Sequence, residues 1–338
     1  MMSYNWLSGK GIAALTLAAA LIAPGIAQAA KPIVLNLAHS ATPDNSLSHA
    51  YEFFAQKVKE KTGGSVEIKI HGNGVLAADQ TVIEGAKMGT VDMGSCSTSN
   101  MGSYTSAYLF LDLPFIFKDM EATHKVLWGP IGDEMKEKAS KDIGSKVLFY
   151  VDCGGGFRLV VNNKREIRTP ADMKGLKFRV TGSPLERAWV EALGASGTPV
   201  PFIEVYTALE QKVVDGENLF PMWVYLNKHY EALKYMTAIS GMTNPHVCVI
   251  SNFAWKRLSP EQQKAIIEAG QETQEYAAKE DAEVCKDMTD KLVAAGLKLY
   301  VPTPAEVEEW RKVSMSIYPK FYDKIPEEFI ARVLKAQE

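Results

Sequence analysis

The chain contains little cysteine and no block of basic residues. Its four cysteines are Cys96, Cys153, Cys248 and Cys285, and none belongs to a Cys-x-x-Cys pair. This spacing matches neither a zinc site nor a thiol-redox motif, so we expect buried thiols and keep one disulfide as an alternative. The net charge of −3 comes with no Lys/Arg block that could follow a phosphate backbone. We therefore expect no nucleic-acid partner.

The chain also lacks the short motifs of common enzymes. It has no G-x-S-x-G elbow, P-loop, H-E-x-x-H or strand-following G-x-G-x-x-G. The segment "CGGGF" precedes a strand and therefore cannot place a phosphate at a helix N-terminus. The histidines are scattered without ligand spacing: His39, His49, His71, His124, His229 and His246. We expect no cofactor, no metal site and no enzymatic activity. A secreted enzyme on a two-lobed scaffold is the alternative, which turnover would support.

Long hydrophobic runs are absent after the first thirty residues. At the N-terminus, Lys10 precedes the apolar stretch "GIAALTLAAALIAPGIA", and residues 27–29 read Ala-Gln-Ala, the small-x-small pattern of a cleavage site. We expect a cleaved signal peptide over residues 1–29 and a mature protein that begins near Ala30. Its location is then the periplasm or, in a single-membrane cell, the outside of the cytoplasmic membrane. No later segment has the roughly eighteen apolar residues that a membrane span needs, so we expect no membrane insertion after cleavage.

Strand and helix patterns alternate along the chain. A length of 338 residues favours two domains. Strand patterns at 33–40, 65–72 and 91–96 enclose helix patterns at about 47–62 and 78–88, an order typical of βαβ units around a parallel sheet. The second half repeats this alternation with different residues. The predicted fold class is therefore α/β, with two lobes that each hold a mostly parallel sheet flanked by helices.

One helix pattern is much longer than the others. It begins at Ser259 and Pro260, a strong helix start, and continues to about Ala295. About ten turns exceed the size of one small lobe. No flexible interdomain linker appears, so we expect two lobes joined by strands and by this long helix, which spans both.

Two strand patterns carry an arginine at one end. The segment "GLKFRVTG" alternates apolar and polar residues, and its polar face ends in Arg179. In the segment "GGGFRLVV", Arg158 stands directly ahead of an apolar run. Charged residues at strand ends are usually solvated, so the pattern alone leaves a surface role and a binding role open.

The segment around Arg179 resembles a known family. The run "NNKREIRTPADMKGLKFRVTGSPLERAWVEALGASGTPVPFIEVYTALEQKVVDG" resembles the signature region of the periplasmic solute-binding proteins (DctP family) of tripartite ATP-independent periplasmic (TRAP) transporters. Residues 170–179 match the family's Pro-x-Asp-x-Lys-Gly-x-Lys-x-Arg segment. "PFIEVYTALEQ" matches its P-x-x-E-V-Y-x-A-L-Q helix, with Glu210 in place of the usual Gln. Further segments agree, among them "GTVDMGSCSTS", "LDLPFIFKD" and "FAWKRLSPEQQKAI", so the resemblance covers essentially the whole mature chain.

The resemblance implies a binding protein that closes two lobes on an organic acid anion and delivers it to a membrane permease for ion-gradient-driven uptake. The implied ligand is a carboxylate such as a dicarboxylate, keto acid or hydroxy acid, with a small sulfonate such as isethionate as an alternative. Service to an ATP-driven transporter is a further alternative. We expect lobe I to comprise residues 30–153 plus about 244–285, and lobe II about 154–243 plus 286–338, with the ligand cleft between them.

The resemblance also implies roles for particular residues. Arg179 matches the family's bidentate carboxylate clamp, a role that suits a planar guanidinium, and Arg158 matches a second cationic contact. The other matched cleft positions are His39, Ser97, Phe202 and Trp223.

One segment departs from the family pattern. The family commonly reads Asp-Gly-Gln-Glu-Asn-Pro, with a ligand-contacting Asn, where this chain reads "DGENLFPMW". Leu219 takes the Asn position without a gap, and Asn218 takes it with a one-residue shift. If Leu219 lines the pocket, we expect a ligand that is less polar than a sugar acid, or differently shaped.

Overall fold

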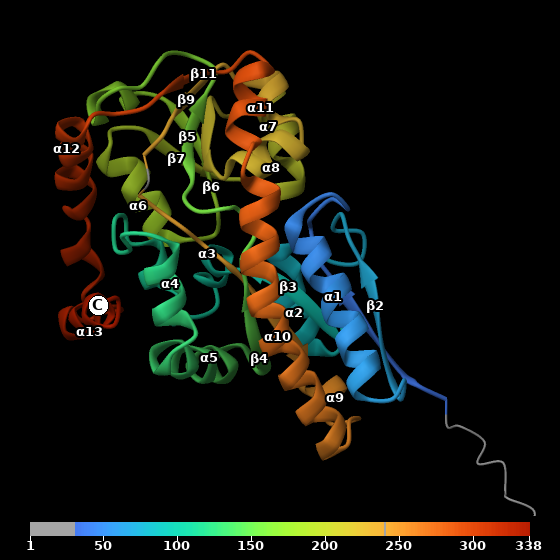
Figure 1. Cartoon of the computed structure of the whole chain (residues 1–338). Helices are drawn as coiled ribbons and strands as arrows, with labels where there is room; N and C mark the ends of the chain where they lie inside the picture. The colour runs from blue at the N-terminus through green and yellow to red at the C-terminus, as the bar shows by residue number, and fades with distance from the viewer. Residues whose placement is uncertain (1–30, 240) are drawn as a thin grey trace, which may run out of the picture. The chain divides into compact units, whose positions relative to one another are not determined.

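Two mixed β-sheets, flanked by helices, organise the chain in a computed structural model that describes residues 31–239 and 241–338 (Figure 1). The predicted signal peptide lies outside the described residues. The first sheet has the order β2-β1-β3-β10-β4. Its strands are β1 (Ile33–Ala38), β2 (Val66–His71), β3 (Met93–Ser97), β4 (Ser145–Val151) and β10 (His246–Ser251). The second sheet has the order β11-β9-β5-β8-β6-β7. Its strands are β5 (Leu159–Asn162), β6 (Lys177–Val180), β7 (Ser196–Pro199), β8 (Gly216–Leu219), β9 (Tyr235–Thr237) and β11 (Lys298–Tyr300).

Each sheet contains both parallel and antiparallel strand pairs. The pairs β1–β2, β1–β3, β6–β7, β6–β8 and β9–β11 are parallel. Strand β10 is antiparallel to β3 and β4, and β5 is antiparallel to β8 and β9. The chain enters β5 directly from the first sheet and β10 directly from the second. The two strands that are antiparallel to both of their neighbours are thus the ones that the chain enters directly when it passes from one sheet to the other.

Helices cover both sheets. The α-helices are α1 (Ser46–Lys61), α2 (Asp79–Met88), α3 (Thr98–Met101), α4 (Met120–Leu127), α5 (Pro130–Ile143), α6 (Pro184–Ala192), α7 (Val205–Glu210), α8 (Pro221–Leu226), α9 (Asn252–Trp255), α10 (Pro260–Cys285), α11 (Met288–Ala294), α12 (Pro304–Met315) and α13 (Glu327–Lys335). Short 3₁₀ turns are η1 (Leu109–Asp112), η2 (Pro170–Met173), η3 (Phe202–Glu204), η4 (His229–Ala232) and η5 (Tyr318–Phe321). Among the described residues, no helix is both long and apolar enough to span a bilayer.

The long helix α10 spans both lobes, as predicted. The side chains of Ser259 and Gln262 accept each other's backbone N–H groups at its start, which satisfies two donors that a helix N-terminus leaves free. The helix packs on α1 and β4 beside the first sheet and on α8 beside the second, and Figure 1 shows it in orange along both. It ends at Cys285 rather than near Ala295. Asp287 leaves helical geometry (φ −106°, ψ 6°), and α11 begins after it.

Helix α10 also holds the segment that links the two sheets. Asp281 Oδ2 accepts the backbone N–H groups of Gly154 and Gly155 at 3.0 and 2.5 Å, just after β4. Burial raises the pKa of the Asp281 carboxyl to about 6. The same segment leads to Arg158, so this contact helps to fix the backbone that carries one of the predicted site residues.

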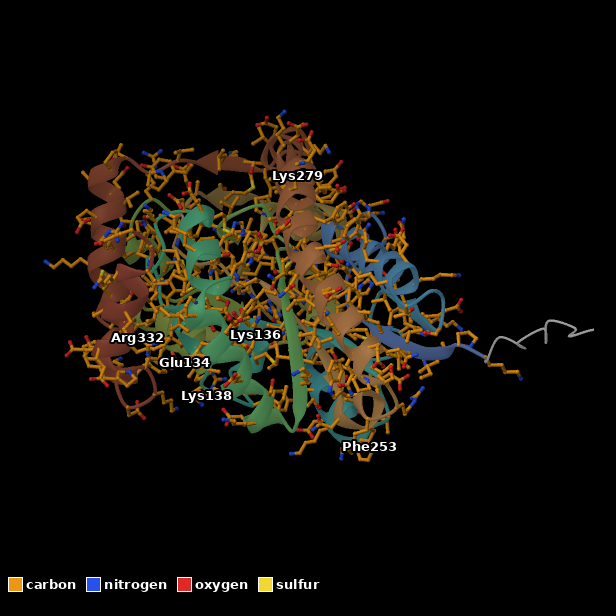
Figure 2. The ribbon with its side chains drawn as sticks, turned by 60° about the horizontal axis from the view of Figure 1, so that its bottom comes forward. Glu134, Lys136, Lys138, Phe253, Lys279 and Arg332 are labelled. Atoms are coloured by element: carbon orange, nitrogen blue, oxygen red, sulfur yellow. The ribbon has the colours of Figure 1, made fainter. Side chains whose placement is uncertain are left out.

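The C-terminal helices pack back on the earlier chain. Trp189 Nε1 of α6 donates to Ser314 Oγ of α12 at 2.9 Å. Arg332 of α13 forms an exposed ion pair with Glu134 of α5 at 2.6 Å (Figure 2). Helix α13 lies in the range predicted for lobe II, whereas α5 lies in the range predicted for lobe I. The lobe boundaries stay a prediction.

Candidate functional site

Residues on or next to both sheets line a cavity of about 400 Å³, a volume that includes space open to solvent. Each sheet contributes the edge at which its parallel strands end. Parallel strands contribute residues at their carboxyl ends, and the antiparallel strands β5 and β10 contribute residues at their amino ends, because reversal brings those ends to the same edge. From the first sheet come Ser40, Asp79, Ser97, Asn100, Cys153 and His246. From the second sheet come Arg158, Arg179, Thr181, Phe202, Leu219, Phe220 and Trp223, and Asn244 lies on the segment between the sheets.

Arg179 lies on β6 with most of its hydrogen-bonding capacity unused. The side chain is only 3% exposed. Its Nε donates to the backbone carbonyl of Val200 at 3.1 Å, and its two terminal nitrogens have no hydrogen-bond partner within the described chain. Burial is the main cause that lowers its pKa, although Glu186 and Glu217 oppose that effect. A guanidinium remains charged in a protein, so this buried cation presents a fork of free donors to the cavity.

Arg158 lies directly before β5 and is paired. Its Nη1 donates to Glu186 Oε1 at 2.8 Å, its Nε to Asn244 Oδ1 at 2.9 Å, and its Nη2 to Ser99 Oγ at 3.2 Å. The guanidinium carbon also lies 5.7 Å from the ring centroid of Phe220. Both members of the Arg158–Glu186 pair are almost fully buried. Arg158 therefore contributes a cation to the cavity wall that already has its counter-ion.

Glu186 connects Arg158 to the segment that follows β6, because its other carboxylate oxygen accepts hydrogen bonds from Thr181. Its Oε2 accepts the backbone N–H of Thr181 at 2.8 Å and the Thr181 hydroxyl at close range. Behind Arg158, the hydroxyl of Ser99 also donates to Asp112. Desolvation raises the pKa of the buried Asp112 carboxyl to about 6, although Arg158 acts against this rise.

Asp79 provides a carboxylate on the first-sheet side of the cavity. Its Oδ2 accepts the Ser97 backbone N–H at 3.0 Å and the Asn100 amide at 3.3 Å, and its Oδ1 accepts the Ser40 hydroxyl at 3.1 Å. His246 Nε2 lies 3.9 Å from Asp79 Oδ2, and its Nδ1 lies 2.9 Å from Ser95 Oγ. Burial lowers the pKa of His246, which favours a neutral ring at neutral pH.

Aromatic and aliphatic side chains form the rest of the wall. The rings of Phe202 and Trp223 meet edge to face with centroids 4.9 Å apart. Trp223 also stacks on His246 at 5.9 Å, and its indole N–H donates to the Cys153 carbonyl. Leu219 completes this apolar surface. A ligand would thus meet charged groups at its ends and apolar surface along its body.

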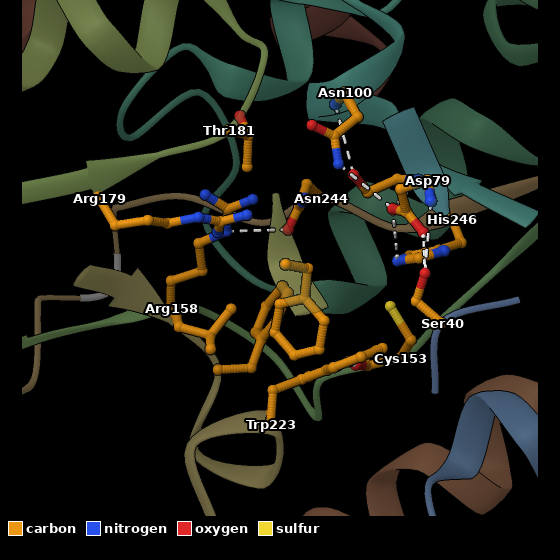
Figure 3. A pocket seen from close by; sticks show the side chains of 14 residues that line it. Ser40, Asp79, Asn100, Cys153, Arg158, Arg179, Thr181, Trp223, Asn244 and His246 are labelled. Atoms are coloured by element: carbon orange, nitrogen blue, oxygen red, sulfur yellow. Dashed lines mark hydrogen bonds and ion pairs between the residues drawn. The ribbon is translucent and has the colours of Figure 1, made fainter. Parts of the chain in front are cut away.

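The structure brings most of the predicted site residues together. Those that line the cavity are Arg158, Arg179, Ser97, Phe202, Leu219 and Trp223 (Figure 3). His39 is buried beside the cavity, where its Nδ1 accepts the Ala41 N–H at 3.2 Å and its ring stacks on Tyr51. Burial lowers the pKa of His39 to about 4. The ligand-binding roles of all these residues stay predictions.

The structure also separates Asn218 from Leu219. Successive side chains of a strand point to opposite faces, and β8 directs Leu219 to the cavity. The Asn218 amide nitrogen lies 3.4 Å from Met242 Sδ instead. Of the two alternatives that the sequence leaves open, the side chain at the cavity is therefore the leucine.

Several cavity residues were not foreseen from the sequence. They are Ser40, Asp79, Asn100, Cys153, Thr181, Phe220, Asn244 and His246. A signal for some of them existed, because Ser40 is the last residue of a predicted strand and Thr181 directly follows the strand pattern that carries Arg179, and sites of α/β folds gather at strand ends. Asp79 and Asn100 had no such signal, because each belongs to a helix whose docking only the fold decides.

All four cysteines carry free thiols, and three of them are buried. Within the described ranges, no group of three or more His, Cys, Asp or Glu side chains is placed to hold a metal ion.

The sequence model of one family, described as "Bacterial extracellular solute-binding protein, family 7" (DctP), matches residues 37–325. The chain belongs to this family. The DctP-family protein is 32% identical over 265 residues to the 2,3-diketo-L-gulonate-binding periplasmic protein YiaO of Escherichia coli, covering 78% of this chain and 80% of that protein. It is 28% identical to the C4-dicarboxylate-binding periplasmic protein DctP of Rhodobacter capsulatus, over 97% of both chains.

Solved structures agree with this membership. A TRAP periplasmic solute-binding protein from Sulfurospirillum deleyianum, with bound succinate, superposes with a TM-score of 0.84 at 32% identity, covering 89% of this chain and 98% of that one. The sugar acid binding protein DctPAm from Advenella mimigardefordensis, in complex with galactonate, gives a TM-score of 0.86 at 28% identity, covering 91% and 98%. The predicted identity as a TRAP solute-binding protein is thereby confirmed. The family consists of extracytoplasmic binding proteins rather than enzymes.

Proposed function

We propose that this DctP-family protein captures a small organic acid anion outside the cytoplasmic membrane and delivers it to the permease of a TRAP transporter for ion-gradient-driven uptake. The observation that carries the proposal is Arg179, a buried guanidinium whose terminal nitrogens have no partner within the described chain. Burying an unpaired charge is costly. A planar carboxylate that accepts two parallel hydrogen bonds removes that cost and fits the guanidinium fork.

Capture in this proposal depends on both lobes. Arg158 and Arg179 would hold the anion from the second sheet, and Ser97 would contact it from the first. Since the ligand would touch both sides, it would favour the closed state over the open one, as a hinge mechanism requires. The connection through Gly154 and Gly155, which Asp281 holds, is the proposed hinge.

The relatives guide the choice of ligands for the first test. Those solved with a ligand include complexes with succinate, galactonate and glucuronate. A thermal-shift screen of the purified protein against mono-, di-, keto- and hydroxy-acids and small sulfonates should identify at least one ligand, because a ligand at one hundred times its Kd adds about 2.7 kcal/mol to stability. Calorimetry on the best acid should then give one site per chain and no product. Turnover would favour the enzyme alternative, and a screen in which no acid binds would contradict the proposed function.

Export is proposed along with binding. The mature chain should begin near Ala30, and the intact mass of the exported protein measures this directly. A full-length mass would contradict the cleaved signal peptide.

A further inference from the structure

The two ends of the cavity carry opposite charge. Figure 3 shows the guanidinium groups of Arg158 and Arg179 on one side and Asp79 with His246 on the other. Both arginines belong to the second sheet, whereas Asp79 begins α2 beside the first. Asp79 is only 4% exposed and lines the cavity. Any ligand that reaches from Arg179 across to the first sheet must therefore end near a carboxylate.

The placement of the charges at the cavity favours a ligand with one carboxylate over a ligand with two. Among the described residues, Glu186 pairs with Arg158 at 2.8 Å, whereas Arg179 has no counter-ion within ion-pair distance. A monocarboxylate supplies that counter-ion. A second carboxylate would remain unpaired in a buried site and would face Asp79, and both desolvation and like-charge repulsion oppose this.

The hydrogen bonds at Asp79 indicate what the far end of the ligand should carry. A carboxylate only accepts hydrogen bonds and has about four acceptor positions. Ser97 and Asn100 donate to Oδ2, and Ser40 donates to Oδ1. Oδ1 therefore keeps one acceptor position for a donor that arrives from the cavity. His246 Nε2 lies 3.9 Å from Asp79 Oδ2, and burial lowers the pKa of the His246 ring, which favours its neutral form.

We propose that the cavity selects a monocarboxylate that carries a hydrogen-bond donor, either a hydroxyl or an ammonium group, at the end opposite its carboxylate, and that it discriminates against dicarboxylates. This inference rests on the proposed function, because it assumes that Arg179 binds the carboxylate. It would separate this chain from relatives that bind C4-dicarboxylates.

The experiment compares ligands of equal length in calorimetry. For chains of three to six carbons, each dicarboxylate is paired with its ω-hydroxy acid and its ω-amino acid, as in succinate, 4-hydroxybutyrate and 4-aminobutyrate. At the best length, the wild-type protein should bind a donor-bearing acid at least tenfold more tightly than the dicarboxylate. Equal or tighter binding of the dicarboxylate would overturn the inference, and this comparison requires no variant.

Asp79→Asn tests the residue itself. The amide removes the charge and should reduce the preference for the donor-bearing acid at least tenfold, largely by tighter binding of the dicarboxylate. In the Asp79→Asn protein, a greater loss of affinity for the ω-amino acid would identify ammonium as the donor that Asp79 prefers, and a greater loss for the ω-hydroxy acid would identify the hydroxyl. An unchanged preference in a folded Asp79→Asn protein would overturn the inference.

Asp215→Asn is the matched control. Asp215 is also buried, but it accepts the Lys177 N–H at 3.0 Å and pairs with Lys164 at 3.2 Å, away from the cavity lining. The preference should not change in this variant, and an equal change would mean that net charge rather than Asp79 is responsible. If no acid binds the wild-type protein at all, the proposed function fails and this inference with it. If acids bind through Arg179 without the preference, only the inference fails.

Discussion

The surroundings of Arg158 and Arg179 differ although both residues line one cavity and both are almost fully buried. Every nitrogen of Arg158 donates to a protein acceptor, and Phe220 lies beside its guanidinium. Within residues 31–239 and 241–338, the Arg179 side chain donates a hydrogen bond through its Nε alone. Equal residue type and equal burial therefore come with different hydrogen bonding: protein acceptors hold all three nitrogens of Arg158, whereas the terminal nitrogens of Arg179 have no such partner within the described chain.

The difference follows from the cost of burying charge. A buried ion pair whose partners satisfy each other is costly to break, because the remaining partner becomes an unpaired buried charge. A buried cation without its partner instead has a strong preference for an incoming anion. We expect changes at Arg158 to appear mainly in the free energy of unfolding, and changes at Arg179 to appear mainly in ligand affinity.

The largest effect is expected for Arg158→Met. Removing the cation leaves Glu186 buried and unpaired, so the free energy of unfolding should fall by about 3–5 kcal/mol in urea denaturation. Adding Glu186→Gln should recover part of the loss. The control is Arg332→Met, since the Arg332–Glu134 pair is exposed and should contribute at most about 1 kcal/mol. If Arg158→Met were as stable as the wild type, Arg158 would not be a structural residue.

Arg179→Lys should weaken ligand binding by about 2–3 kcal/mol, or roughly 30- to 150-fold in Kd. The charge remains, but a single ammonium cannot replace two coplanar hydrogen bonds. Calorimetry with the best acid from the screen measures the loss, and unfolding of the ligand-free protein should change by less than about 1 kcal/mol. Arg165→Lys, at an exposed arginine, is the control. Wild-type affinity in Arg179→Lys would mean that Arg179 is not the clamp.

The region behind Arg158 should also respond to pH through Asp112. Its pKa is raised to about 6, so the folded state holds this proton more tightly than the unfolded state. The resulting stabilisation is full below the unfolded pKa near 3.9 and is lost as the pH rises through 6. Between pH 4.5 and 6.5 the wild type should lose about 1–2 kcal/mol more than Asp112→Asn in urea denaturation. Because Asp281 titrates in both proteins, its contribution cancels. Parallel pH profiles would show that Arg158 keeps Asp112 ionised.

The smallest effect is expected at Phe202, on the Arg179 side of the cavity. Phe202→Leu keeps an apolar side chain but removes the edge-to-face contact with Trp223, worth about 1 kcal/mol. Ligand affinity should fall by roughly fivefold in calorimetry. Phe253→Leu is the control, since Phe253 is 63% exposed and lies outside the cavity (Figure 2). If the two variants changed ligand affinity equally, Phe202 would not belong to the binding surface.

Much of the fold could be predicted because its signals are local. The strand that carries Arg179 follows from alternating residues, and the start of α10 follows from Ser259, Pro260 and Gln262 within one turn. Strand β8 was missed: all four of its residues are buried, and none shows the alternation of a half-buried strand. Its Glu217 is accommodated by His229, whose Nδ1 lies 2.8 Å from Oε1. The alternation of polar and apolar residues along the chain cannot predict this contact between two buried polar residues.

The sequence by itself determined the α/β class, the family and the presence of two arginines at strand ends, because these depend on short patterns and on a motif of contiguous residues. Only the tertiary structure decided which arginine donates to protein acceptors through all three of its side-chain nitrogens. The partners of Arg158 are Glu186, Ser99 and Asn244, which stand 28, 59 and 86 positions away along the chain. It likewise decided that Asp79 faces the arginines and that Leu219, not Asn218, reaches the cavity. Hydrogen bonds and burial act through space, and no local pattern specifies which distant residues will share a site.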